Sequence, residues 1–340
     1  MSSSKGVRRA YHAGSWYDAN PIQLKEELES NLSQVVPLPT LDYNPPCQDA
    51  KAIISPHAGY TYSGQAAAWA YASIPTDRYK KVFVIGPSHH QSFHGIALSP
   101  FKSYATPFGE ILLCTDTIQA LRETGEFTQM RSAGDEEEHS LEMQMPYLRL
   151  IFQGRDDLRL VPLIVSHPTA AQYESYASIL APYWNDPESF FVFSTDFCHW
   201  GSRFSYTNYY PQAPFPEDPV PPISSPGEKP AIPLTMRSTP GGGGQIWQSI
   251  QYMDHEGIAI LRDPTSPTAV DDWNAYLNRT GNTICGRYGL SLFLHLVKKV
   301  YGSSSGKNVK TTFVRYEQNE KCHTSRDSSV SYVSGVVRVQ

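Results

Sequence analysis

Histidines follow three separate apolar runs of the kind that form buried strands. The stretch "KAIISPHAGYTY" places His57 after one run, and "VFVIGPSHH" places His89 and His90 after another. The stretch "FFVFSTDFCHWG" places Asp196 and His199 after a third run. Functional sites of open α/β sheets collect at the carboxyl ends of their strands. Each histidine alone is more often structural, but three at equivalent positions favour one shared site.

The types of these side chains fit a metal site better than other chemistries. Two histidines and a third, anionic ligand form a common set for divalent metals. Asp196 and His199 could then act as an oriented general base beside the metal. A Ser-His-Asp hydrolase is poorly supported because the chain has no G-x-S-x-G motif. The phosphate-binding P-loop and the dinucleotide-binding G-x-G-x-x-G motif are absent too.

Three further residues have both a chemical and a structural interpretation. Cys285, in "GNTICGRYGLSLFLHL", precedes an apolar helix, whose N-terminus would stabilise a thiolate, although a buried thiol that fills space is commoner. The run "GDEEEHSLEMQMPYL" predicts a helix N-terminus, at which His139 either points into the site or caps the helix. Trp16, in "HAGSWY", is either a core residue or the wall of a cleft.

Strand patterns alternate with helix patterns along the chain, which predicts a mostly parallel or mixed sheet flanked by helices. The expected strands span residues 51–55, 81–86, 95–99, 158–165, 190–195, 311–317 and 329–339. The expected helices span residues 21–35, 63–74, 140–152, 171–184, 245–261, 267–277 and 289–301. We therefore predict the α/β class.

One segment departs from this pattern. Residues 211–244 are dense in Pro, Ser and Gly, and such a composition buries too little apolar surface to offset the entropy of the chain. Helical patterning resumes at residue 245, so the segment is interpreted as a mobile surface insertion and not as a boundary. We expect a single domain over residues 1–340.

Composition excludes several classes of partner. The chain has 340 residues and a net charge of −5, with no long basic tract, which argues against nucleic acid and anionic membranes. No apolar run reaches the roughly 20 residues that span a bilayer, and no signal peptide is evident. The five scattered cysteines predict a reduced protein, located in the cytoplasm and also in the nucleus.

Seven motifs in order along the chain carry a resemblance to a known family. They are "HAGSWY", "PHAGYTYSG", "GPSHH", "EEEHSLEMQMPYL", "STDFCHWG", "NTICGR" and "DSSVSYVSG". From about residue 8 to residue 338, the chain resembles the Memo proteins, mediators of ErbB-driven cell motility. The resemblance implies the fold of the class III extradiol dioxygenases, which cleave catechol rings with non-haem iron, and a site that has diverged from theirs.

The resemblance also implies roles for particular residues. His57 and His89 match the two histidine ligands of the dioxygenase fold, and His199 matches its catalytic base, with Asp196 beside it. Cys285 matches a Memo cysteine that stands where the dioxygenase ligand is a glutamate. The site is therefore expected to hold Fe(II) or Cu(I) through His57, His89 and Cys285.

Four further residues are expected in the cleft. Trp16 and Tyr62 match Memo residues implicated in binding a phosphotyrosine peptide. We expect His90 to neighbour the ligands or to donate a hydrogen bond in the cleft, and His139 to lie there also.

Two functions from different classes follow from these expectations. The first is a metal-binding protein that acts in cell signalling, motility and redox homeostasis. Its partner would be a phosphotyrosine-containing peptide or a signalling protein. The second is an active non-haem oxidoreductase that acts on a small aromatic substrate. A thiolate ligand favours softer ions and is easily oxidised beside iron and oxygen, so Cys285 favours the first function.

Overall fold

The computed structural model describes residues 6–210, 232–233, 245–302 and 308–340. The predicted mobile insertion at 211–244 lies outside the described residues, except for the short strand β12 (Ile232–Pro233). Among the described residues, no helix is both long enough and apolar enough to cross a membrane.

A mixed sheet forms the centre of the molecule, with the strand order β10-β14-β2-β9-β3-β8-β4-β7, and β13 also pairs with β14. Four neighbouring strands are parallel: β2 (Ala50–Ser55), β9 (Ser189–Ser194), β3 (Lys81–Pro87) and β8 (Arg159–Ser166). Both faces of these strands are buried, which explains their continuous apolar sequences. The single α/β domain with a mixed sheet and flanking helices confirms the predicted fold class.

Antiparallel strands extend the parallel centre on both sides. On one side, β14 (Ser329–Val339) pairs with β2, with β13 (Val309–Gln318) and with β10 (His199–Trp200). On the other side, β4 (Gly95–Leu98) runs antiparallel to β8 and parallel to β7 (Thr128–Gln129). The strands expected from the sequence are all present, within two residues at each end.

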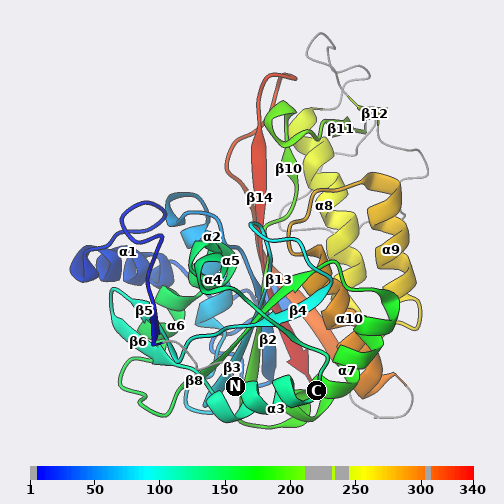
Figure 1. The fold of residues 1–340 in the computed structure, drawn as a ribbon. Coiled ribbons are helices and arrows are strands. Elements are labelled where there is room, and N and C mark those ends of the chain that lie inside the picture. The colour runs from blue at the N-terminus through cyan, green and yellow to red at the C-terminus, as the bar shows by residue number, and fades with distance from the viewer. Residues whose placement is uncertain (1–5, 211–231, 234–244, 303–307) are drawn as a thin grey trace.

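Helices cover both faces of the sheet (Figure 1). One group consists of α1 (Pro21–Ser33), α2 (Tyr60–Ala72), α4 (Ser132–Glu137), α5 (His139–Glu142) and α6 (Met145–Ile151). The other group consists of α7 (Ala170–Asn185), α8 (Ile246–Arg262), α9 (Ala269–Thr280) and α10 (Arg287–Tyr301). Helix α2 packs on β2 and β14, whereas α10 packs on β3 and β9 from the opposite face.

Some elements differ from the prediction. The helix expected over 140–152 is two helices, because Pro146 lacks the N–H group that would continue the first, and it lies instead in the first turn of α6. Helix α3 (Thr115–Glu123) and the small sheet of β1 (Val7–Arg8), β5 (Ser103–Thr106) and β6 (Gly109–Leu112) were not expected. The strand β11 (Asn208–Tyr209), which pairs with β12, was not expected either.

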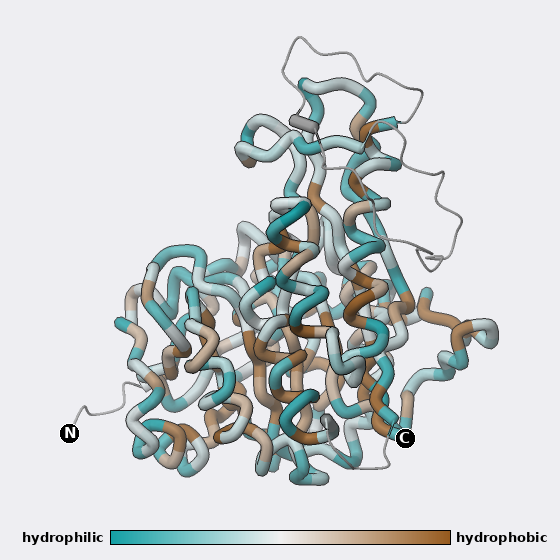
Figure 2. The backbone as a smooth tube through the Cα atoms, turned by 90° about the vertical axis from the view of Figure 1, so that its right-hand side faces the viewer, coloured by the Kyte–Doolittle hydropathy of each residue, from teal (hydrophilic) through white to brown (hydrophobic). Residues whose placement is uncertain are grey.

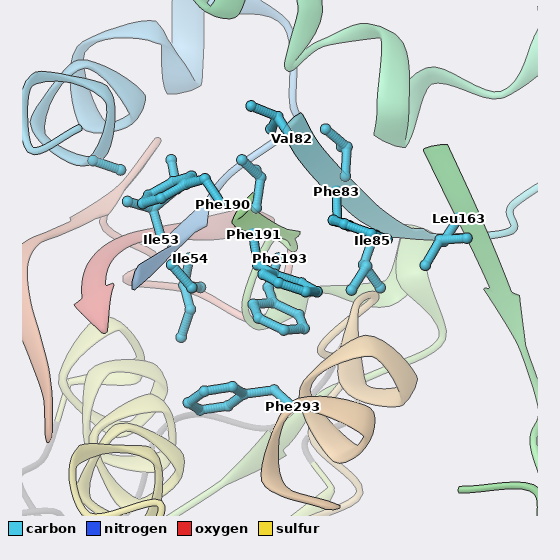
Figure 3. Close-up of a cluster of buried hydrophobic side chains, with 14 of the residues drawn as sticks. Ile53, Ile54, Val82, Phe83, Ile85, Leu163, Phe190, Phe191, Phe193 and Phe293 are labelled. Atoms are coloured by element: carbon cyan, nitrogen blue, oxygen red, sulfur yellow. The ribbon is translucent and has the colours of Figure 1, made fainter. Parts of the chain in front are cut away.

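Aromatic rings fill the core between the sheet and α10. Phe191 of β9 stacks on Phe83 of β3, with ring centroids 4.7 Å apart. Figure 3 shows Phe293 of α10 facing the phenylalanines of β9, and its centroid lies 5.1 Å from that of Phe193. Figure 2 shows apolar segments concentrated in the interior strands and alternating with polar ones along the helices. This packing fixes the strands whose ends carry the predicted site.

A second buried feature is a carboxylate on α8. Asp254 is fully buried, and its Oδ1 accepts hydrogen bonds from the Cys198 N–H at 3.2 Å and from Asn282 Nδ2 at 2.9 Å. Its Oδ2 accepts a hydrogen bond from the Tyr316 hydroxyl at 2.9 Å. Burial raises the pKa of Asp254 to about 6, because these hydrogen bonds only partly offset the loss of solvation.

Titration of Asp254 is expected to change stability in a defined pH range. The folded state holds the proton more tightly than the unfolded state, so stability should fall as the pH rises from about 4 to about 6, by at most about 1.4 kcal/mol per pH unit. Urea unfolding of the parent and Asp254→Asn proteins measures this, because the variant lacks the titrating group. A difference between the two proteins that is constant over this range would contradict the prediction.

Candidate metal centre

Neighbouring strand ends bring the predicted site residues together. Because β2, β9 and β3 are adjacent and parallel, the residues after their carboxyl ends, His57, Asp196 and His89, lie at one edge of the sheet. They line a cavity of about 630 Å³ with His139 and His199. Five of the more exposed lining residues, here called the rim, are Trp16, Tyr62, Arg203, Phe204 and Glu320.

The protonated nitrogen of His57 is fixed by a chain of hydrogen bonds. The Ser194 hydroxyl donates its proton to the Ser140 carbonyl at 2.6 Å and accepts from Gln144 Nε2 at 2.9 Å. His57 Nδ1, 2.8 Å from the same oxygen, must therefore be the donor in that contact. The lone pair of His57 is then on Nε2. Hydrogen bonds of this type orient metal-binding histidines and set their tautomer.

His89 is held in the same tautomer by a carboxylate. Glu138 accepts hydrogen bonds from the His89 N–H at 2.6 Å and from its Nδ1 at 2.8 Å. Burial opposes ionisation of Glu138, but hydrogen bonds with His89 outweigh it and lower the pKa of Glu138 to about 2. An ionised carboxylate only accepts hydrogen bonds, so Nδ1 of His89 is protonated and Nε2 is its ligand atom.

His199 is oriented by two backbone carbonyls. Its Nδ1 lies 2.9 Å from the Phe197 carbonyl oxygen and 3.1 Å from that of Thr283, and both oxygens can only accept. Burial lowers the pKa of His199, so the imidazole is neutral, with its lone pair on Nε2. The orientation of the His199 ring therefore comes from these carbonyls. The Asp196 carboxylate instead accepts a hydrogen bond from the backbone N–H of His57 at 2.8 Å.

Cys285 lies against His57 and Asp196. Its Sγ is 3.1 Å from His57 Nε2, and the Asp196 N–H donates to this sulfur at 3.2 Å. The following residue, Gly286, is required for this approach, because a Cβ there would lie 2.3 Å from the Cβ of Thr195. The Cys285 loop can therefore meet the end of β9 only with glycine at position 286.

Two sets of three potential ligands meet at His57. Within each set the ligand atoms lie within 4.8 Å of one another, and the sets are His57, His89 and His139, and His57, Asp196 and Cys285. In the first set the rings of His89 and His139 are stacked, with centroids 4.2 Å apart and planes 16° apart. Lone pairs lie in the ring plane, so stacked rings cannot direct theirs at one ion. His139 could join His89 as a ligand only after rotating.

Cys285 also interacts with His89. Burial lowers the pKa of His89, but hydrogen bonds with Cys285 and Glu138 outweigh it and raise this pKa to about 10. Burial raises the pKa of Cys285, and the hydrogen bond with His89 opposes that rise. The sulfur thus influences both imidazoles, although His89 and Cys285 belong to different sets of potential ligands, which share only His57 among the described residues.

Three other groups of the cavity, His57, His139 and Asp196, are shifted toward their neutral forms. Burial lowers the pKa of His57 well below its usual range, and the neighbouring imidazoles add to this. Burial and His89 lower the pKa of His139 to about 3, while burial raises the pKa of Asp196 to about 7. Neutral imidazoles have free lone pairs, which suits them to bind a cation or accept a proton.

Aromatic rings surround the rim, in part as expected. Trp16 packs beside His139 with ring centroids 4.4 Å apart, and Tyr62 is 59% exposed. His90 is not among the residues that line the cavity. Its ring lies edge-on to that of His139, with ring centroids 6.1 Å apart. Arg203, which the sequence analysis did not select, places its guanidinium over the Phe204 ring at the rim, 4.4 Å from the centroid.

The hydrogen-bond partners of the histidines were also missed. Glu138 belongs to an acidic run that was interpreted as a helix N-terminus, and its carboxylate does accept from the Ser140 N–H at 2.9 Å as the N-cap of α5. Its sequence gave no sign of the additional bond to His89. Ser194 lies near the end of the strand expected over 190–195 and is the last residue of β9. The signal that the sequence offers is a polar residue at the end of an apolar run.

Comparison with known proteins identifies relatives over the full chain. Residues 8–336 match the family described as Memo-like protein. The chain is 34% identical to Protein MEMO1 of Danio rerio and 33% identical to Protein MEMO1 of Homo sapiens, each over an alignment of 342 positions that covers all of both chains. It is 33% identical to the Protein memo-1 homolog of Caenorhabditis elegans, over 98% of this chain and 83% of the relative.

Proposed function

Because this chain belongs to the Memo-like protein family, we propose that it is a metal-binding protein whose cleft holds one iron or copper ion through His57, His89 and Cys285. The observation that carries this proposal is the common tautomer of the two histidines. Ser194 and Glu138 each accept the Nδ1–H of one histidine, so Nε2 is the atom that each ring can offer to a metal. On His89, whose pKa is raised to about 10, the metal must first displace the proton on Nε2.

The donor set decides which ion is preferred. Two borderline imidazoles and a soft thiolate favour Cu(I), whereas Fe(II) prefers a carboxylate as the third ligand. Asp196 is the nearby carboxylate, with its Oδ2 4.0 Å from His57 Nε2. We therefore propose Cu(I) as the tighter ligand and Fe(II) as the weaker one.

The proposed biological role follows the family resemblance. We propose that the protein acts in cell signalling, motility and redox homeostasis in the cytoplasm and the nucleus. A buried thiolate ligand beside a redox-active ion suits a role in holding that ion rather than in turnover with oxygen, which would oxidise the sulfur.

A competitive Cu(I) titration of single variants tests the proposal. His57→Ala removes a donor and should weaken Cu(I) binding by about tenfold or more. His199→Ala is the matched control, because His199 lines the same cavity but belongs to neither three-donor set among the described residues. Equal weakening by both variants, or none by either, would contradict the assignment of the ligands.

We also propose that the rim binds a phosphotyrosine peptide. Arg203 supplies a cation at the rim, and Trp16 and Tyr62 supply aromatic surface for a ring. A guanidinium pairs well with phosphate oxygens. Glu320 on the same rim would disfavour a second anionic group beside the phosphate.

Trp16→Ala is expected to weaken binding of a phosphotyrosine peptide by about 1–3 kcal/mol, as the loss of an aromatic anchor does. Fluorescence anisotropy with a labelled peptide measures the effect, and the unphosphorylated peptide is the control. Equal affinity of the parent protein for both peptides would remove phosphotyrosine as the recognised group.

A second candidate function is oxidation of a small aromatic substrate, and the orientation of His199 favours it. A neutral imidazole with its Nε2 lone pair toward the cavity is suited to take a proton from a phenol. Oxygen uptake by the iron-loaded protein with a panel of catechols tests this function. Ring-opened product in the parent, lost in His199→Ala, would place this function first.

A further inference from the structure

A second cavity lies between the helices that flank the Cys285 loop. It has a volume of about 510 Å³ and is formed by α9, the start of α10, the loop between them and residues near the start of α7. None of its lining residues lines the candidate metal centre. Its size is in the range of small-molecule sites.

The lining of this cavity is polar and carries no carboxylate. Asn274 and Asn278 of α9 contribute amides, Thr283 and Tyr288 contribute hydroxyls, and Arg287 contributes the only charged side chain among the described lining residues. A lining with one cation and no acid favours an anionic ligand.

Arg287 is held in place and retains free donors. Its Nη1 donates to the Ile284 carbonyl and its Nη2 to the Tyr288 hydroxyl, each at 3.2 Å, and its guanidinium stacks over the Tyr288 ring at 4.5 Å. These contacts orient the planar group, while its other N–H groups have no partner among the described residues. A fixed guanidinium with free donors binds phosphate or carboxylate oxygens well.

The lining also contains an acceptor without a donor. Asn282 is 3% exposed, and its Nδ2 donates to Asp254 Oδ1 at 2.9 Å and to the Tyr276 hydroxyl at 2.8 Å, which fixes the amide orientation. Its Oδ1 is buried without a hydrogen-bond partner in the described part of the chain. Such an acceptor costs free energy unless a water or a ligand hydroxyl donates to it.

We propose that this cavity is a binding site for a small hydroxylated anion of the sugar-phosphate type. The phosphate would pair with Arg287, and the hydroxyl groups would meet the amides of Asn274 and Asn278. This proposal does not depend on a metal in the cleft.

Occupancy of the cavity is coupled to the cleft through Thr283. The Thr283 hydroxyl accepts from the His199 N–H and donates to the His199 carbonyl, each at 2.9 Å, and the Thr283 carbonyl accepts from His199 Nδ1. Cys285 follows two residues later in the same loop. A ligand that contacts Thr283 therefore changes the environment of His199.

Titration of the metal-free protein with ribose 5-phosphate and with inorganic phosphate tests the site. Calorimetry measures the affinity, and NMR of the histidine ring protons reports on His199. We expect Arg287→Gln to weaken binding of ribose 5-phosphate at least about tenfold, the loss expected for one charge-assisted hydrogen bond. Arg131→Gln, at an exposed arginine that lines neither of the two cavities, is the matched control and should leave the affinity unchanged.

A second variant keeps the test valid if Arg287→Gln does not fold. Asn274→Asp places an anion in the lining at an exposed helix position and should abolish binding of ribose 5-phosphate. Loss of binding with Arg203→Gln instead would move the phosphate site to the rim and overturn the proposal. Absence of saturable binding to the parent protein up to about 10 mM would overturn it as well.

Discussion

The Cys285→Ser protein is expected to lose at least about a hundredfold in Cu(I) affinity while it keeps its fold. The change replaces a thiolate donor by a hydroxyl, which is a poor ligand for a soft ion. It removes one of three donors from a set whose total binding energy is on the order of 10 kcal/mol. The fold should persist because the side chain at position 285 changes little in volume. The backbone N–H of Asp196, which donates to the sulfur, can donate to the serine hydroxyl oxygen instead.

The measurement is a competitive Cu(I) titration of both proteins with a chromophoric chelator. Cys114→Ser is a suitable control, because Cys114 is a partly exposed thiol that belongs to neither set of potential ligands at the cleft. Superimposable curves for the parent and Cys285→Ser would exclude the cysteine from the site. In the proposed site, Cys285→Glu should instead shift the preference toward Fe(II), because it supplies a hard carboxylate.

The Arg8→Ala protein is expected to lose about 3–5 kcal/mol of unfolding free energy, as the removal of one partner from a buried ion pair does. Arg8 is 1% exposed, and its guanidinium donates to Asp135 Oδ1 at 3.0 Å and to Glu142 Oε2 at 2.7 Å. Both carboxylates are buried as well. Alanine leaves them in the interior without their cation.

The neighbouring residue provides a matched control for this measurement. Arg9 pairs with Glu136 at 2.9 Å, but its side chain is 71% exposed, so Arg9→Ala should change the unfolding free energy by only about 0–1 kcal/mol. Urea denaturation of the three proteins gives the comparison. A similar small loss in both variants would show that the buried network contributes little to stability.

Many strands and helices could be predicted from the sequence, because they follow from local residue preferences and from regular patterns of apolar residues. The strands β2, β3 and β9 are recognisable from unbroken apolar runs, since both of their faces are buried. The histidines at their ends were found by the rule that sites form at carboxyl ends of strands. Cys285 has no such strand before it and was selected from its position before an apolar helix. The family motifs then supplied its expected role as the third ligand.

Other features depend on contacts that no local pattern encodes. The antiparallel pairing of β14 with β2 joins segments nearly 300 residues apart, and only the folded chain reveals it. The bonds of Glu138 to His89 and of Ser194 to His57 connect different elements in the same way. Arg203 reaches the rim from a short 3-10 helix, Ser202–Phe204, whose sequence resembles any polar loop.

The position of β14 has a consequence for synthesis of the protein. A ribosome adds residues 329–339 long after β2, β9 and β3 have been made, and these three strands carry the histidines of the site. Until then, one edge of β2 has unpaired backbone groups in an otherwise apolar strand, and such an edge can pair with other chains. The nascent chain thus passes through a stage in which the imidazoles are present beside an open sheet edge. Chaperones that shield such edges would act on it at that stage.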